Sequence, residues 1–228
     1  MSARLGELTW PEVRDSARPP LVVVPVGSCE QHGPHLPLDT DTRVAVALAE
    51  ALVQSFEPGE VVVAPPITVS ASGEHAGFPG TLSYGNVVVE SMLVELVRSA
   101  DWSSGVVLVN GHGGNAIPVR RAVSTLTAEK RRVLPWWPHV TGSDAHAGNT
   151  ETSLMLAIAP DLVRIDRAER GRMEHVTDLI DELRAGGMRA VSPNGVLGDP
   201  HGATAAHGRS LLTRLTIDLV AAVDDWRV

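Results

Sequence analysis

Short apolar segments alternate along this chain with longer amphipathic ones. Runs rich in β-branched residues predict buried strands at residues 21–26, 61–69 and 105–110, the second broken by Pro65-Pro66, and a weaker run predicts a fourth at 133–136. The longer segments repeat apolar residues every three or four positions, which is the spacing of a helix packed on one face. These helices are expected at residues 42–56, 86–100, 118–131, 150–159, 174–185 and 208–226.

Alternation of strands and helices favours a mostly parallel sheet that helices cover on both faces. The predicted fold class is therefore α/β, with three layers. No internal repeat or linker divides the sequence, so residues 1–228 are expected to form a single domain. Ligands in such folds bind beyond the carboxyl ends of the strands, and the loops at those ends become the places to look for chemistry.

Composition narrows the possible functions. The formal net charge is −8 and no basic stripe with interleaved aromatic residues occurs, which argues against a nucleic-acid partner. Cys29 is the only cysteine, so an intrachain disulfide is impossible; we expect a small buried thiol in a reducing, cytoplasmic protein. The first 18 residues lack the apolar core of a signal peptide, and no apolar run approaches the roughly 20 residues that span a bilayer.

The loop after the first predicted strand, residues 27–41, concentrates metal-binding side chains. Five potential ligands lie in it: Glu30, His32, His35, Asp39 and Asp41. Residues two apart in an extended segment point the same way, so Glu30 and His32 can face one cavity. Asp41 sits at the start of a helix, where its carboxylate could bridge two cations. The alternative is that residues 39–41 only cap that helix and that the histidines lie on the surface.

Two further loops follow later strands. In residues 110–115 three glycines surround His112 and would let the backbone approach a ligand closely; a tight strand-to-helix turn would explain the glycines but not the histidine. In residues 144–153, His146 and Glu151 flank a predicted helix start. A histidine beside a cation-bound water suits a general acid, whereas Glu151 could simply complete a first-turn charge pattern.

Two other features stay open at this level. Residues 73–81 form a glycine-rich segment with Glu74 and His75, either a lid that faces substrate or an ordinary exposed connection. Trp136 and Trp137 could line a pocket or belong to the core. His201 and His207 read first as part of a turn before the last helix, and a second metal site there is the weaker interpretation.

Three of these segments, residues 27–37, 110–115 and 146–153, closely resemble the signature of the creatininase (creatinine amidohydrolase) family and occur in the family's order. The resemblance implies an α/β fold with a binuclear centre of divalent metal ions. Glu30, Asp41 and His112 would hold one ion, and His32 with a bridging Asp41 the other. His146 and Glu151 would lie at the catalytic water and substrate. Mixed carboxylate and imidazole ligands suit zinc, iron(II) or manganese.

One position departs from the family pattern. Creatininases carry a glutamate two residues after the histidine of the second loop, as a ligand of the second metal, and this chain has Gly114 there. The second ion would then be held more weakly, be completed by another carboxylate such as Glu151, or be absent. This departure also disfavours creatinine itself as the substrate.

Within the family, residues 36–42, 195–200 and 203–206 are similar to a peptidase branch. That resemblance implies an amide hydrolase that releases a C-terminal Val-Tyr dipeptide from a small modified precursor peptide during maturation of a redox cofactor. It also implies a homo-oligomer, a hexamer or a larger ring. The alternatives are another family amidohydrolase acting on a formamide or creatinine-like amide, and a metal-binding assembly protein without catalysis.

Overall fold

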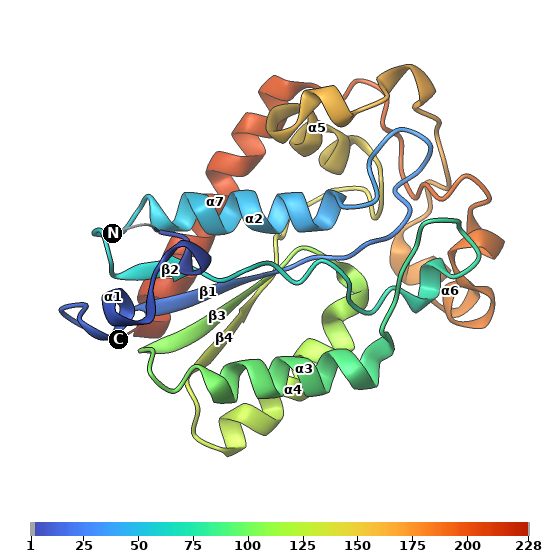
Figure 1. The fold of residues 1–228 in the computed structure, drawn as a ribbon. Helices are drawn as coiled ribbons and strands as arrows, with labels where there is room; N and C mark the ends of the chain where they lie inside the picture. Colours follow the sequence, from blue (N-terminus) through green and yellow to red (C-terminus); the bar gives the residue numbers. More distant parts are fainter. Residues whose placement is uncertain (1–2, 228) are drawn as a thin grey trace.

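A computed structural model describes residues 3–227, so residues 1, 2 and 228 of the predicted domain lie outside it. Its sheet has the order β2-β1-β3-β4, with every one of these pairings parallel (Figure 1). The strands are β1 (Leu21–Val26), β2 (Val61–Val63), β3 (Gly105–Asn110) and β4 (Val133–Trp136). The predicted α/β class with a parallel sheet is confirmed. The second strand is shorter than the predicted 61–69, because Pro65 and Pro66 cannot donate to a sheet ladder.

Helices cover both faces of the sheet, which explains why the strands are apolar throughout rather than alternating. On one face α2 (Thr40–Val53), α5 (Asn149–Ile158) and α7 (Ala205–Arg227) pack over Val23, Val107 and Val109. On the other, α3 (Gly85–Ser99) and α4 (Ala116–Ala128) lie side by side over Val24 and Leu108 (Figure 1). Neighbouring residues of each strand thus enter opposite cores, and the predicted three layers are present.

Each predicted helix forms, with ends shifted by a few residues. The bounds are α2 (Thr40–Val53), α3 (Gly85–Ser99), α4 (Ala116–Ala128), α5 (Asn149–Ile158), α6 (Val176–Val191) and α7 (Ala205–Arg227). Helix α6 runs beyond the predicted residue 185 but is kinked at Gly187, where φ is +70°. A short helix without a counterpart in the predictions, α1 (Trp10–Arg14), starts with a capping box between Thr9 and Glu12.

Two glycines bring the loops at the carboxyl ends of β1 and β3 against the start of α2. A Cβ on Gly27 would overlap the backbone of Thr42, and a Cβ on Gly111 would lie 2.5 Å from the carbonyl oxygen of Asp41. Side chains at either position would push the loops away from the helix. The first turn of α2 therefore sits directly between the two loops. None of the helices in residues 3–227 is long and apolar enough to cross a membrane.

Candidate metal centre

Asp41 occupies the first turn of α2 and is buried, with its carboxylate between two imidazoles. Its Oδ1 lies 3.0 Å from Nε2 of His32, and its Oδ2 lies 3.1 Å from Nδ1 of His112. The Ser28 hydroxyl also donates to Oδ2, at 2.7 Å. Asp39, at the N-cap, makes no side-chain capping bond and pairs with Arg43 instead. The capping alternative thus does not describe Asp41, whose carboxylate faces the histidines.

The hydrogen bonds of the two histidines fix where their protons lie. Nδ1 of His32 donates to the carbonyl oxygen of Glu30 at 3.1 Å, and Nε2 of His112 donates to that of Ala71 at 3.0 Å. A neutral imidazole carries a single N–H, so the nitrogens that face Asp41 are left with lone pairs. Lone pairs opposite a carboxylate repel it unless a positive charge lies between them. Both oxygens of Asp41 are in this situation.

Glu30 is a second buried carboxylate of the same cluster. It is fully buried, and no donor in residues 3–227 has hydrogen-bond geometry to either carboxylate oxygen. The nearest nitrogens are Nε2 of His112 at 3.1 Å and Nε2 of His75 at 3.2 Å. Burial alone would raise the pKa of Glu30, but the adjacent His112 imidazole outweighs it and lowers that pKa to about 2. A buried carboxylate with two orphaned oxygens fits a cation.

The pKa of His32 also indicates that this site favours a positive charge. Burial alone would lower the pKa of this imidazole, but the Asp41 carboxylate outweighs burial and raises it to about 10. The protein therefore favours a positive charge between His32 and Asp41. A proton can supply that charge, and so can a divalent cation that displaces it.

The third loop brings His146 and Glu151 to the same place. Glu151, in the first turn of α5, puts Oε2 at 3.9 Å from Nε2 of His32 and accepts a 2.6 Å bond from the Ala147 N–H. Burial raises the pKa of Glu151 to about 7. The ring of His146 lies 4.4 Å from that of His32, and its Nε2 donates to the Gln31 carbonyl at 2.9 Å. Burial holds the pKa of His146 well below its ordinary value.

Within residues 3–227, three sets of side chains are close enough to hold a metal ion. One joins Glu30, Asp41 and His112, a second joins His32, Asp41 and Glu151, and a third joins Glu30, His32 and His146. The first two share Asp41. All six residues singled out from the sequence, four as metal ligands and two as catalytic groups, thus come together at one place.

The sequence did not assign three neighbours of this cluster: Gln31, Glu74 and His75. The Gln31 amide donates to Nδ1 of His75 at 2.9 Å and to the Gly195 carbonyl at 3.0 Å, and its oxygen accepts from the Gly33 N–H. His75 is buried, and its Nε2 faces Glu30. In the sequence, the available signal for Glu74 and His75 was that two titratable residues stand side by side in the glycine-rich segment after the second strand. That pattern fitted an exposed connection equally well.

Other sequence candidates lie away from the cluster. His35 is buried but bonds to the Thr152 hydroxyl, at 2.9 Å. His201 is exposed and pairs with Asp199. The expectation of a buried Cys29 is wrong, because the strand-end loop leaves it partly exposed, with Sγ 3.6 Å from the Gly80 carbonyl. Trp136 packs in the core under α2 and α7, and Trp137 packs against the core on the other face.

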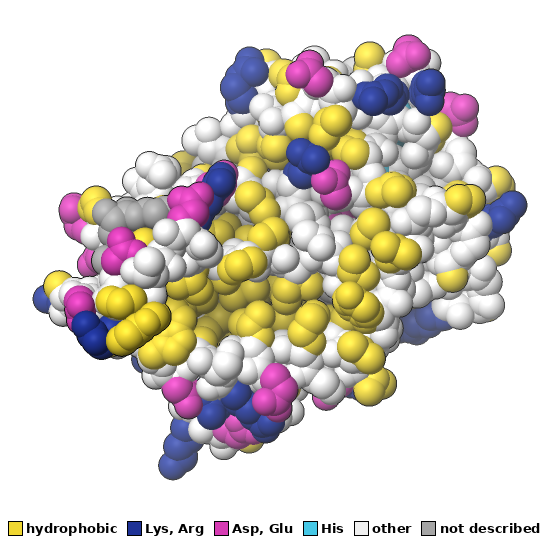
Figure 2. Space-filling view, in the orientation of Figure 1, with side chains coloured by type: hydrophobic (Ala, Val, Ile, Leu, Met, Phe, Trp, Pro, Cys, Tyr) yellow, Lys and Arg dark blue, Asp and Glu magenta, His cyan; other side chains and the backbone are white. Residues whose placement is uncertain are grey.

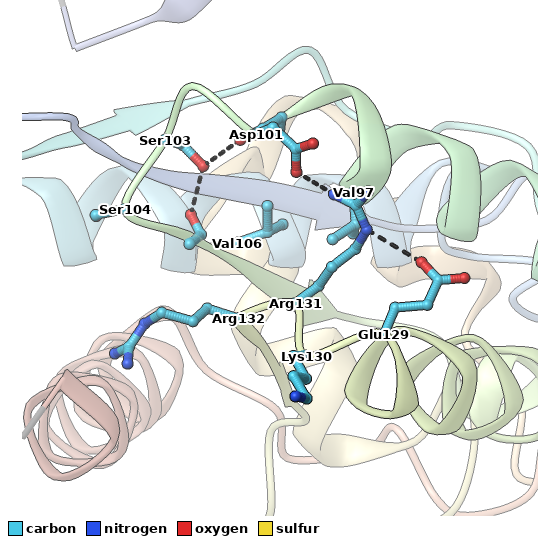
Figure 3. A pocket seen from close by; sticks show the side chains of 11 residues that line it. Val97, Asp101, Ser103, Ser104, Val106, Glu129, Lys130, Arg131 and Arg132 are labelled. Carbon is cyan, nitrogen blue, oxygen red and sulfur yellow. Dashed lines mark hydrogen bonds and ion pairs between the residues drawn. The ribbon is translucent and has the colours of Figure 1, made fainter.

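Of two cavities in the structure, one lies beside the candidate metal ligands and the other lies away from them. A cavity of about 160 Å³ is lined by Asp41 and Glu151, together with apolar side chains that include Val44, Leu154 and Leu215. A larger hollow, of about 350 Å³, lies at the amino end of β3, where Arg131 pairs with Asp101 and Glu129 (Figure 3). The smaller cavity is the one that reaches the candidate metal centre.

Comparison with known proteins places this arrangement in a family. The sequence profile of creatininase, described as creatinine amidohydrolase, matches residues 6–223. The chain belongs to the creatininase family. Solved creatininases have the same fold: one named for manganese gives a TM-score of 0.82 at 23% identity, covering 99% of this chain and 98% of that one. A mutant creatininase of Zn-Zn type gives 0.83 over the same shares of the two chains.

Among creatininase relatives, the mycofactocin precursor peptide peptidase of Mycolicibacterium smegmatis is 48% identical to this chain. The match covers 91% of this chain and 86% of that protein. The creatinine amidohydrolase of Pseudomonas putida is 31% identical, over 73% and 75% of the two chains. The similarity to the peptidase is thus both higher and more extensive than the similarity to this creatinine-cleaving relative.

The raised pKa of Glu151 predicts a pH-dependent stability in chelator-treated protein. A carboxyl that keeps its proton up to about pH 7 when folded, but loses it near pH 4.5 when unfolded, favours the folded state less as pH rises between these values. Glu151→Gln removes this loss. Relative to the unmodified protein, the variant should gain on the order of 1–3 kcal/mol in unfolding free energy between pH 5 and pH 8, measured by urea denaturation. An equal difference at both pH values would contradict the assignment.

Proposed function

We propose that this chain is a metal-dependent peptidase that acts on the mycofactocin precursor peptide and releases its C-terminal Val-Tyr dipeptide. Two facts support the proposal from different directions. The relative that carries this peptidase name is 48% identical over almost the whole chain. The site itself supplies the observation that carries the chemistry, namely the Asp41 carboxylate held between two imidazole rings, each of which donates from its other nitrogen to a backbone carbonyl.

The metal centre is proposed to hold two divalent cations that share Asp41. Glu30 and His112 complete the first site, and His32 with Glu151 the second. In this assignment Glu151 replaces, as a ligand of the second ion, the glutamate that creatininases carry at the position of Gly114. Bound there, divalent cations lower the pKa of water toward neutrality and polarise the carbonyl of an amide. The ligand types are compatible with zinc, manganese or iron(II).

The remaining residues orient and protonate the substrate. Nε2 of His146 carries its proton, because it donates to the Gln31 carbonyl, and its ring is held 4.4 Å from that of His32. A neutral ring acts as an acid only after it has taken up a proton; the attacking water can give one to His146, which can then pass it to the leaving nitrogen of the cleaved bond. The cavity beside Asp41 and Glu151 has apolar side chains on part of its wall, Val44, Leu154 and Leu215 among them, and gives one residue of a peptide a place next to the reacting carbonyl.

The substitution of Asp41 by asparagine, which replaces one carboxylate oxygen by an amide nitrogen, tests the metal centre. Asp41→Asn removes the charge that faces both imidazoles, so bound metal should fall by at least one equivalent and activity by about 100-fold or more. Elemental analysis and activity assays measure the two effects. Asp39→Asn, two residues earlier and paired with Arg43 on the surface, should keep both. Full metal occupancy in a folded Asp41→Asn protein would count against the site.

The peptidase activity itself is tested with the precursor peptide. The protein, loaded with zinc, manganese or iron(II), should shorten the modified precursor by its last two residues, and mass spectrometry detects the loss. Creatinine and a formamide serve as competing substrates. Hydrolysis of either of them with both forms of the peptide left intact would reject the peptidase and retain an amide hydrolase. Absence of any amide cleavage by metal-loaded protein would favour a non-catalytic metal-binding protein.

We also propose that the protein works as a homo-oligomer, a hexamer or a larger ring. The face drawn in Figure 2 carries a broad apolar area between α2 and α3. A groove of about 580 Å³ is lined by Leu5, Leu8, Trp10 and Trp102, and Trp10 is 72% exposed. Exposed apolar surface of this extent is typical of association sites. Light scattering at micromolar concentration should give a multimer, and a monomeric mass would refute the proposal.

A further inference from the structure

Helices α2 and α5 contribute to the cavity beside the candidate metal centre in the same way. On α2 the cavity is lined by Asp41 and, three residues later, by Val44; on α5 it is lined by Glu151 and, three residues later, by Leu154. Residues three apart on a helix lie on the same face, one turn from each other. Each helix therefore presents a carboxylate to His32 and, one turn further along, an apolar side chain to the cavity.

The apolar part of the cavity wall belongs to the core of the protein. Val44 and Leu154 are at most 5% exposed, and Leu215 of α7, which also lines the cavity, is fully buried. All three belong to the cluster of apolar side chains on that face of the sheet. Side chains in a close-packed core have little room to rearrange. The cavity therefore exists before a ligand enters it, and its apolar floor is rigid.

The polar part of the wall leaves no charge for a ligand to pair with. Asp144 accepts hydrogen bonds from the backbone N–H groups of Asn149 and Thr150, one through each carboxylate oxygen, and so caps α5. Asp41 and Glu151 are the candidate metal ligands. None of the described residues that line the cavity is Lys, Arg or His. A carboxylate would meet three carboxyl groups there, and an ammonium group would lose its water against an apolar floor, so the cavity suits an uncharged side chain.

The volume of the cavity limits the side chain that it can take. It measures about 160 Å³. A dry apolar cavity of about 150 Å³ holds one molecule of benzene. The side chains of valine and leucine are smaller than benzene, whereas those of tyrosine and tryptophan are larger. A short branched side chain therefore fits this cavity, and a large aromatic one does not.

In a peptide that loses a C-terminal Val-Tyr dipeptide, valine supplies the leaving nitrogen, so its side chain must lie close to the metal ligands. We infer that the cavity is the pocket for this side chain and that Val44 and Leu154 set its size. The protein then selects a short, branched, uncharged residue directly after the cleaved bond, and the tyrosine lies outside the cavity. The inference rests on the proposed peptidase activity.

The substitution Val44→Leu tests the size limit, because one added methylene reduces the space beside Asp41. Precursor peptides with alanine, valine, tryptophan or aspartate as the penultimate residue compete with the modified precursor for the zinc-loaded protein, so that peptides which bind without being cut are also measured. The parent protein should prefer valine to alanine by about 10-fold, and valine to tryptophan or aspartate by about 100-fold or more. In Val44→Leu the order of valine and alanine should be reversed.

Val119→Leu is the matched control. Val119 is also a buried valine on a helix, but it lies on α4, in the core on the opposite face of the sheet. This variant should keep the preference for valine and lose a few degrees in Tm, because an added methylene overpacks a filled core. Val44→Leu has an empty cavity beside it, so its Tm and its zinc content should match those of the parent. The Tm comparison does not depend on activity.

The same order of peptides in Val44→Leu as in the parent would overturn the inference. It would also be overturned if aspartate competed as well as valine, if Val119→Leu changed the order, or if Val44→Leu lost as much Tm as Val119→Leu. Failure of the zinc-loaded parent protein to cut the modified precursor would instead reject the proposed peptidase.

Discussion

Two carboxylates, those of Glu30 and Asp41, are buried among imidazole rings whose nitrogens lie 3.0 to 3.2 Å from the carboxylate oxygens. Taking a carboxylate out of water costs several kcal/mol unless an opposite charge accompanies it. In this protein the opposite charge must come from protonated histidines or from bound cations. The loops after β1 and β3 and the first turns of α2 and α5 all meet at these carboxylates. The structure at the carboxyl ends of the strands therefore holds together the groups that need this positive charge.

The loops after β1 and β3 are held at the start of α2 by close contacts between their backbones. Gly27 and Gly111 allow the two loops to touch the start of α2, and the helix holds Asp41 still because its backbone is hydrogen-bonded. Shifting either loop by the width of a methyl group would separate the imidazoles from the carboxylate. Each oxygen of Asp41 has one histidine beside it, and these two histidines come from the loops that follow the neighbouring parallel strands β1 and β3.

Gly114 is the position at which the candidate metal centre departs from the creatininase pattern. The creatininase pattern puts a carboxylate at that position, whereas in this chain Glu151 approaches His32 from α5 and Glu74 approaches His112 from the segment before α3. Carboxylates from other loops thus surround the histidines without a side chain at 114. The cavity beside Asp41 and Glu151 is lined by both polar and apolar side chains, Asp144 and Leu154 among them.

The sequence by itself determined the strands, the helices within a few residues, the α/β class, and the six residues Glu30, His32, Asp41, His112, His146 and Glu151 that the structure brings together. It could do so because apolar periodicity reflects burial, because ligand types cluster on loops at the carboxyl ends of strands, and because the resemblance of three of these segments to the creatininase signature selected the six residues among those candidates. Tertiary structure alone decided the places of Glu74, His75 and Gln31. Their contacts with His112 and Glu30 join segments more than 35 residues apart, through a loop whose local pattern fits an exposed turn. It also decided that His35, a ligand type in the same loop as Glu30, turns away, because its ring bonds to the Thr152 hydroxyl, 117 residues along the chain. Asp39 turns away for a local reason, since it pairs with Arg43 one helical turn later.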